Sequence, residues 1–205
     1  MSKQYLYNTF VLLKTTAQTT NIKGKDMKIT VITGSPRKKG NSFAMTQAFI
    51  DEAVKCGHTV ERFDAAFMKI GGCHACQTCF KTGKACSFDD DFNTIAPSIL
   101  ESDAVVLTMP TYWYSIPSQI KGVIDRLYSF CVGGKDIAGK KLGLIVCCEE
   151  DDMTVMDGVR KPIERSAQLL KWDIVGEVLV PGVLETGDID KTDGCAQAAA
   201  LAHKF

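Results

Sequence analysis

Four cysteines lie close together in the middle of the chain, at Cys73, Cys76, Cys79 and Cys86. Four thiolates at compact spacing suit an iron–sulfur cluster or a tetrahedral zinc ion. The repeated Cys-x2-Cys-x2-Cys spacing favours a 4Fe–4S cluster, because zinc sites usually pair two Cys-x2-Cys units across a longer insert. Free thiols are the third interpretation, since cysteines this close in sequence can also perform thiol–disulfide exchange.

A polar segment near the start of the chain suits a phosphate group. Residues 33–42 read TGSPRKKGNS and join an expected strand to an expected helix. The helix N-terminus offers unpaired backbone N–H groups, Ser35, Asn41 and Ser42 add side-chain donors, and Arg37 supplies positive charge. The segment matches neither Gly-x-Gly-x-x-Gly nor a nucleotide-triphosphate loop. The alternative is a polar turn in which Asn41 or Ser42 only caps the helix.

An aromatic segment follows the third expected strand. Tyr112, Trp113 and Tyr114 stand between Pro110 and Pro117. Such a turn is stiff and can present ring faces and backbone N–H groups to a flat heterocycle. Alternatively, these rings cover the edge of the sheet or a subunit interface.

The elements that must position these segments alternate between β-branched runs and amphipathic stretches, which predicts a parallel sheet with helices on both faces. The expected strands are 28–33, 59–64, 104–109, 141–148 and 174–181, and the expected helices are 41–56, 91–102, 117–131, 155–171 and 191–204. In the third helix, a buried stripe is predicted for Ile120, Val123, Ile124, Leu127 and Cys131. Ligands of such sheets bind at the carboxyl ends of the strands, so the phosphate and aromatic segments should flank one crevice.

Composition limits the classes of function. The 205 residues are 45% apolar, which suits a single domain, and the 24 basic and 24 acidic residues balance, so we expect no nucleic acid or membrane partner. No apolar run approaches the length of a membrane span, and no secretory signal is evident. We therefore predict a cytoplasmic protein whose nine cysteines serve metal or redox chemistry. Residues 1–26 form a polar extension, expected to be a poorly ordered tail or an arm on a partner subunit, before a domain at 27–205.

Together these segments resemble the NADPH-dependent FMN reductase family, including its iron–sulfur flavoproteins, within the flavodoxin-like superfamily. The resemblance is carried by GSPRxxGNS at 34–42, by a cysteine loop ending in DDDF at 89–92, and by PTYWxxxPxxxKxxxDR at 110–126. It spans nearly all of residues 27–190. It implies an α/β flavodoxin-like three-layer sandwich with a five-stranded parallel sheet of order 2-1-3-4-5.

The resemblance also implies site residues. It assigns the FMN phosphate to Ser35, Arg37, Asn41 and Ser42, the isoalloxazine ring to Pro110, Thr111, Tyr112, Trp113, Tyr114, Ser115 and Ile116, a further flavin contact to Cys148, and the cluster to Cys73, Cys76, Cys79 and Cys86. Lys121, Asp125 and Arg126 are assigned to the structural frame. The loop after the fourth strand continues as Glu-Glu-Asp-Asp at 149–152, and carboxylates near a flavin disfavour its anionic reduced form.

The implied activity is hydride transfer from NADPH or NADH to FMN, followed by electron delivery to an unidentified acceptor. The flavin supplies that chemistry, so no residue is assigned as catalytic. A second hypothesis is an iron–sulfur flavoprotein that carries electrons with a ferredoxin-like partner, and a third is a metal-binding module with a vestigial flavin site. NAD(P)H oxidation would argue against the second, and zinc uptake without FMN would support the third. By analogy with the family, we expect a homodimer or a tetramer.

Overall fold

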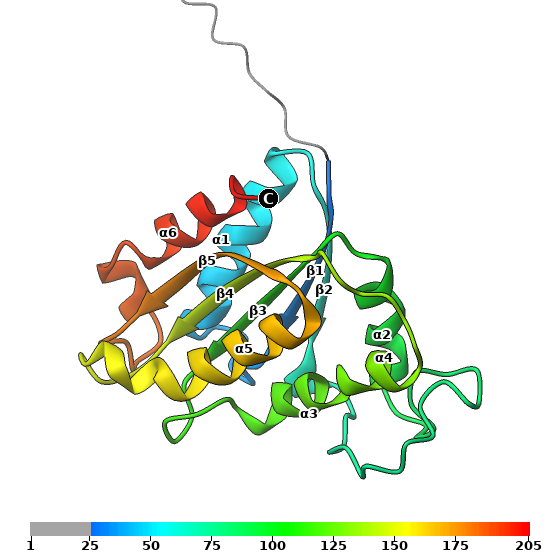
Figure 1. Ribbon diagram of the computed structural model, residues 1–205. Helices are drawn as coiled ribbons and strands as arrows, with labels where there is room; N and C mark the ends of the chain where they lie inside the picture. Colours follow the sequence, from blue (N-terminus) through cyan, green and yellow to red (C-terminus); the bar gives the residue numbers. More distant parts are fainter. Residues whose placement is uncertain (1–25) are drawn as a thin grey trace, which may run out of the picture.

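The computed structural model describes residues 26–205, so the prediction for residues 1–26 lies outside the described residues except at Asp26. Five parallel strands form one sheet of order β2-β1-β3-β4-β5, which confirms the predicted topology (Figure 1). The strands are β1 (Lys28–Thr33), β2 (Thr59–Asp64), β3 (Ala104–Pro110), β4 (Lys141–Cys147) and β5 (Asp173–Val180). The reversal of strand order between β1 and β3 places the loops after these two strands beside each other.

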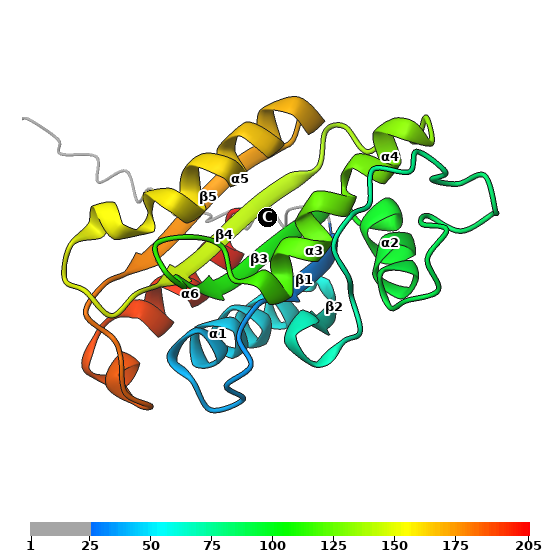
Figure 2. The ribbon, with the colours of Figure 1, turned by 90° about the horizontal axis from the view of Figure 1, so that it is seen from below.

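Helices cover both faces of the sheet, as the three-layer prediction requires (Figure 2). One face carries α1 (Asn41–Lys55) and α6 (Gly194–Ala202), and their apolar cluster includes Ile29 and Val31 of β1. Ile32 points to the opposite face, because successive side chains of a strand alternate. That face carries α2 (Phe92–Glu101), α3 (Ser118–Arg126), α4 (Tyr128–Val132) and α5 (Asp157–Leu170).

The third predicted helix differs from the structure at its end. Leu127 separates α3 from α4, so residues 117–131 do not form one continuous helix. The stripe from Ile120 to Leu127 is buried as predicted, but Cys131 is exposed and its prediction was wrong. Beyond the break, Phe130 is buried in the core and Cys131 is not.

The last two predicted helices are shorter than expected because each follows a separate 3₁₀ turn. Met153–Met156 precedes α5, and Asp188–Lys191 precedes α6. None of the helices within residues 26–205 has both the length and the apolar character to cross a bilayer.

A long loop between β2 and α2 begins with the 3₁₀ turn Ala65–Phe67 and contains all four clustered cysteines. Its base is closed by two hydrogen bonds between Lys69 and Asp91: Asp91 N–H donates to Lys69 O at 3.0 Å, and Lys69 N–H donates to the Asp91 carboxylate at 2.6 Å. The two ends of the loop therefore lie together beside α3 (Figure 1 and Figure 2).

Candidate functional site

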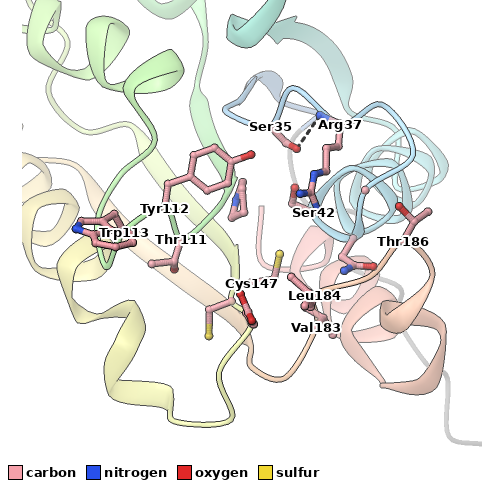
Figure 3. A pocket seen from close by; sticks show the side chains of 15 residues that line it. Ser35, Arg37, Ser42, Thr111, Tyr112, Trp113, Cys147, Val183, Leu184 and Thr186 are labelled. Atoms are coloured by element: carbon pink, nitrogen blue, oxygen red, sulfur yellow. Dashed lines mark hydrogen bonds between the residues drawn. The ribbon is translucent and has the colours of Figure 1, made fainter.

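A cavity of about 430 Å³ opens at the carboxyl edge of the sheet, where the loops after β1, β3, β4 and β5 meet (Figure 3). Its volume lies within the usual range of ligand pockets. It is lined by Ser35, Arg37, Gly40, Asn41, Ser42, Pro110, Thr111, Tyr112, Trp113, Cys147, Cys148, Glu149, Val183, Leu184 and Thr186.

The structure brings most of the predicted flavin residues to this cavity. All four residues of the phosphate segment line it, as do Pro110 to Trp113 and Cys148. Tyr114, Ser115 and Ile116 do not line it, and Ile116 is instead buried in the core. The lining also includes Val183, Leu184 and Thr186 from the loop after β5, which carries no recognisable motif and was missed from the sequence.

The phosphate segment forms a compact turn into α1. Gly40 is the N-cap residue, and no side chain caps this helix, so the capping alternative for Asn41 and Ser42 was wrong. Gly40 N–H donates to Arg37 O at 2.9 Å, and Arg37 N–H donates to Ser35 Oγ at 3.2 Å. The positive end of α1 and the Arg37 side chain thus border the same side of the cavity.

Asn41 joins the phosphate segment to the loop after β5. Its side chain is only 7% exposed, its Nδ2 donates to Glu185 O at 3.0 Å, and its Oδ1 accepts from Ile189 N–H at 3.2 Å. Both polar atoms of the amide are therefore engaged with backbone. Asn41 positions the fourth wall of the cavity, a role that its place in the sequence motif does not reveal.

The aromatic segment folds as a two-residue hairpin. Tyr112 and Ser115 exchange backbone hydrogen bonds of 3.0 Å in both directions, and the two residues between them have φ angles of 48° and 60°. Such turns normally hold Asn-Gly, because both central residues need positive φ. Here they hold Trp113, which lines the cavity although it is 94% exposed (Figure 3), and Tyr114. Tyr112 and Trp113 line the cavity, whereas Tyr114 does not.

Two adjacent cysteines form the floor of the cavity. Burial raises the pKa of Cys147 to about 12, although a hydrogen bond from the backbone of Ser42 opposes this effect. The pKa of Cys148 is also raised, first by burial and then by the charge of Glu150, whose carbonyl oxygen accepts from the Cys148 thiol at 3.3 Å. Both thiols are therefore neutral at ordinary pH, and the floor carries no charge.

The acidic segment after β4 turns mostly away from the cavity. Asp152 accepts hydrogen bonds from the backbone and hydroxyl of Thr154 at 2.9 and 2.8 Å. Glu150 hydrogen-bonds the hydroxyl of Tyr114 and thereby raises the pKa of that phenol. Only Glu149 of this segment lines the cavity, so a single carboxylate stands at its edge.

The four clustered cysteines line a second, smaller cavity between their loop and the residues that follow α3. Cys73 and Cys76 are exposed, Cys79 is half-buried and Cys86 is buried. Hydrogen bonds from the Thr78 hydroxyl and backbone lower the pKa of Cys76 to about 7. Among the described residues, no three of these sulfur atoms lie within 4.8 Å of one another. Zinc–sulfur bonds of about 2.3 Å would bring the sulfurs closer together than that.

The sequence pattern of the NADPH-dependent FMN reductase family matches residues 27–157. The chain belongs to this family. An iron–sulfur flavoprotein of Archaeoglobus fulgidus is 34% identical to this FMN reductase family member over 190 residues, which cover 87% of this chain and 80% of that protein. An iron–sulfur flavoprotein of Methanosarcina thermophila is 31% identical over 100 residues, which cover 49% of this chain and 52% of its own length.

Solved structures agree with the fold of the FMN reductase family. An azoreductase from Bacillus anthracis superposes with a TM-score of 0.67 at 20% identity, covering 87% of this chain and 99% of that one. An NAD(P)H:quinone oxidoreductase from Methanothermobacter marburgensis gives a TM-score of 0.64 at 19% identity, covering 86% and 94%. At these identities the likeness shows the shared flavodoxin-like architecture.

The family membership makes the chain an FMN-dependent NAD(P)H oxidoreductase, and the carboxyl-edge cavity can be tested for its fit to FMN. The Thr111 hydroxyl oxygen is buried in the cavity wall and has no hydrogen-bond partner within residues 26–205. A buried hydroxyl without a partner is unfavourable unless a ligand supplies one. Together with the cationic side at Arg37 and the apolar side at Pro110, this donor set fits a flat, polar-edged ring that carries an anionic tail.

Proposed function

We propose that this FMN reductase family member passes electrons from NADPH or NADH, through FMN in the carboxyl-edge cavity, to a 4Fe–4S cluster held by Cys73, Cys76, Cys79 and Cys86. The observation that carries the proposal is that all four cysteines line one cavity in a fold that has a separate flavin-sized cavity. Relatives named iron–sulfur flavoproteins support the same assignment. The acceptor beyond the cluster is a further redox partner.

The proposed flavin contacts divide by chemistry. Ser35, Arg37 and Ser42 bind the phosphate, because they stand with the N-terminus of α1 on the cationic side of the cavity. Asn41 holds the loop after β5 in place, and its amide is engaged with backbone. The isoalloxazine ring lies against residues 110–113, with the Thr111 hydroxyl donating to its polar edge.

When bound, FMN would accept a hydride and release electrons one or two at a time. The hairpin at 112–115 and the strand ends would hold the ring in the cavity. The neutral thiols of Cys147 and Cys148 place no charge beneath the ring. Glu149 at the edge opposes negative charge on the reduced ring, so this carboxylate lowers the flavin potential.

The spacing of the four cysteine sulfurs suits a cluster better than a single zinc ion. The sulfur atoms are spread more widely than one zinc ion requires, as described above. Arg126 and Ser129 line this cavity, and the Nε atom of Arg126 and the Oγ atom of Ser129 are buried without a hydrogen-bond partner in the described part of the chain. Donors of this kind suit a negatively charged iron–sulfur centre, whose sulfurs accept hydrogen bonds.

The testing experiment is anaerobic purification followed by an absorption spectrum and by quantification of iron, sulfide and FMN on the same sample. We expect about four iron atoms and one FMN per chain, together with oxidation of NADPH or NADH. C79S should lose iron and keep FMN. C131S, which removes an exposed thiol outside the loop, should keep both. Flavin without iron would leave an FMN reductase with free thiols, and zinc without FMN would support a metal-binding module.

The electron-carrier alternative draws support from the exposure of Cys73 and Cys76, which would place a cluster near the surface. A ferredoxin-like partner could reach it there without passing the flavin. Anaerobic mixing with reduced ferredoxin and, separately, with NADPH or NADH distinguishes the two functions. Reduction by ferredoxin alone would favour the carrier, whereas reduction by a nicotinamide cofactor favours the enzyme.

We also propose that a second subunit covers the mouth of the carboxyl-edge cavity in a homodimer or tetramer. Trp113, Tyr114 and Leu184 are 94%, 58% and 43% exposed. Large exposed apolar side chains grouped beside a cavity are typical of an interface. Light scattering should give a dimer or tetramer mass that W113A shifts toward the monomer.

We place the protein in the cytoplasm, whose reducing conditions suit nine free thiols.

A further inference from the structure

Arg126, at the end of α3, is a buried cation next to the cysteine loop. Its side chain is only 3% exposed, and its Nη1 donates to the Asp90 carboxylate, itself 11% exposed, at 2.6 Å. The rings of Phe88 and Phe92 lie 5.7 and 5.4 Å from the guanidinium carbon. Burying a cation is unfavourable by several kcal/mol, on the order seen for buried ions, so its position needs a reason beyond packing.

The ion pair satisfies only part of the guanidinium. Arg126 Nε is buried and has no hydrogen-bond partner among residues 26–205, and the same holds for the hydroxyl of Ser129, whose residue is 3% exposed. Arg126 and Ser129 line the cavity that also contains the four cysteines, whereas Asp90 does not. Arg126 therefore borders both the cysteine cavity and a neighbouring cavity that Asp90 also lines.

We propose that Arg126 and Ser129 are positioning residues that donate hydrogen bonds to the sulfur atoms of the cluster and stabilise its reduced state. The inference rests on the proposed cluster. When an electron arrives, the cluster gains one negative charge and no bond in the chain forms or breaks. A nearby cation and hydrogen-bond donors favour the more negative state, and these are the factors that set cluster potentials.

Asp90 makes this arrangement rigid. It accepts hydrogen bonds from Gly71 N–H at 3.1 Å and from Phe92 N–H at 3.2 Å in addition to Arg126. Because Gly71 precedes the four cysteines and Phe92 follows them, one carboxylate ties both sides of the cysteine segment to Arg126. The guanidinium thus keeps a fixed place relative to the cysteines.

The test measures iron per chain and the reduction potential of the cluster by electron paramagnetic resonance in anaerobic titrations of the full-length, FMN-loaded protein. R126Q should disfavour the reduced cluster by about tenfold, which is 59 mV for a one-electron couple. S129A should shift it in the same direction by a smaller factor, and R126K, which keeps the charge, should stay nearer the wild type. R160Q removes a cation of α5 that pairs with Glu177 of β5, and it should change neither the iron content nor the cluster potential.

Each outcome separates the inference from the proposed function. A wild-type chain without iron would refute the cluster itself. Full iron content in R126Q and S129A with wild-type cluster potentials would refute the role of Arg126 and Ser129 while leaving the cluster intact. If R126Q does not retain iron, S129A and R126K decide. A wild-type cluster potential in S129A overturns the inference, and so does an R126K potential about 59 mV below that of the wild type.

Discussion

Replacing Asn41 with alanine should destabilise the FMN-free protein as well as weaken FMN binding. The substitution removes the hydrogen bonds to Glu185 O and from Ile189 N–H, at 3.0 and 3.2 Å, from a side chain that is 7% exposed. Each bond contributes about 1 kcal/mol, and leaving a buried N–H unpaired adds about 1 kcal/mol more. The expected loss is therefore about 3 kcal/mol of unfolding free energy, or about 10 °C in Tm for a domain of this size.

The assay compares N41A with S42A, since both residues are buried and line the same cavity. Thermal unfolding of each FMN-free protein is followed by circular dichroism, and FMN affinity by quenching of flavin fluorescence. Both variants should bind FMN more weakly, but only N41A should unfold at lower temperature, because no hydrogen bond of the Ser42 hydroxyl joins other elements of the described chain. Unchanged stability in N41A would refute the positioning role and make Asn41 a phosphate ligand only.

Three further results are expected. Replacing Trp113-Tyr114 by Asn-Gly should stabilise the FMN-free protein by about 1–2 kcal/mol in denaturant unfolding, because both positions have positive φ; unchanged stability would argue against strain in the hairpin. E149Q should raise the flavin reduction potential by on the order of 10 mV at low salt and by less at high salt, as measured by spectroelectrochemical titration. A lower potential in E149Q would contradict the assigned position of that charge. Burial opposes ionisation of Asp90, but its hydrogen bonds and the Arg126 charge hold its pKa below the ordinary 3.8. This stabilisation is complete above pH 3.8 and is lost as the pH falls through the lower folded-state pKa, so D90N should flatten the acid limb of a stability–pH curve.

The strands were predictable because a parallel strand that is buried on both faces is a short, nearly continuous run of apolar and β-branched residues. β1 and β2 have the predicted bounds, β3 and β4 differ by one residue at the C-terminal end, and β5 is shifted by one residue at both ends. Helix continuity was less predictable, since periodicity records which residues face the core and not where the axis turns. The stripe from Ile120 to Leu127 is correct, whereas beyond the break at Leu127 the buried residue is Phe130 and not Cys131.

The site was predictable where local sequence determines the contact. The loops after β1 and β3 meet because of strand order, which the alternation of elements already implies. The loop after β5 reaches the cavity through the Asn41 amide, which bonds residues 144 and 148 positions away and leaves no local pattern. Tyr114 does not line the cavity, because the turn after Tyr112 reverses the chain within two residues.

Helix α3 runs from the hairpin beside the first cavity to the wall of the second, so the fold sets the distance between the two cavities. The helix begins at Ser118, directly after the hairpin, and ends at Arg126 in the wall of the cysteine cavity. Its nine residues span about 13 Å at 1.5 Å per residue. Midway, Gly122 lets the loop backbone approach closely, since a Cβ there would lie 3.1 Å from Gly71 O. The cysteine loop therefore packs on the same helix that supports the flavin-side hairpin, so its separation from the first cavity is fixed although much of its own surface is exposed.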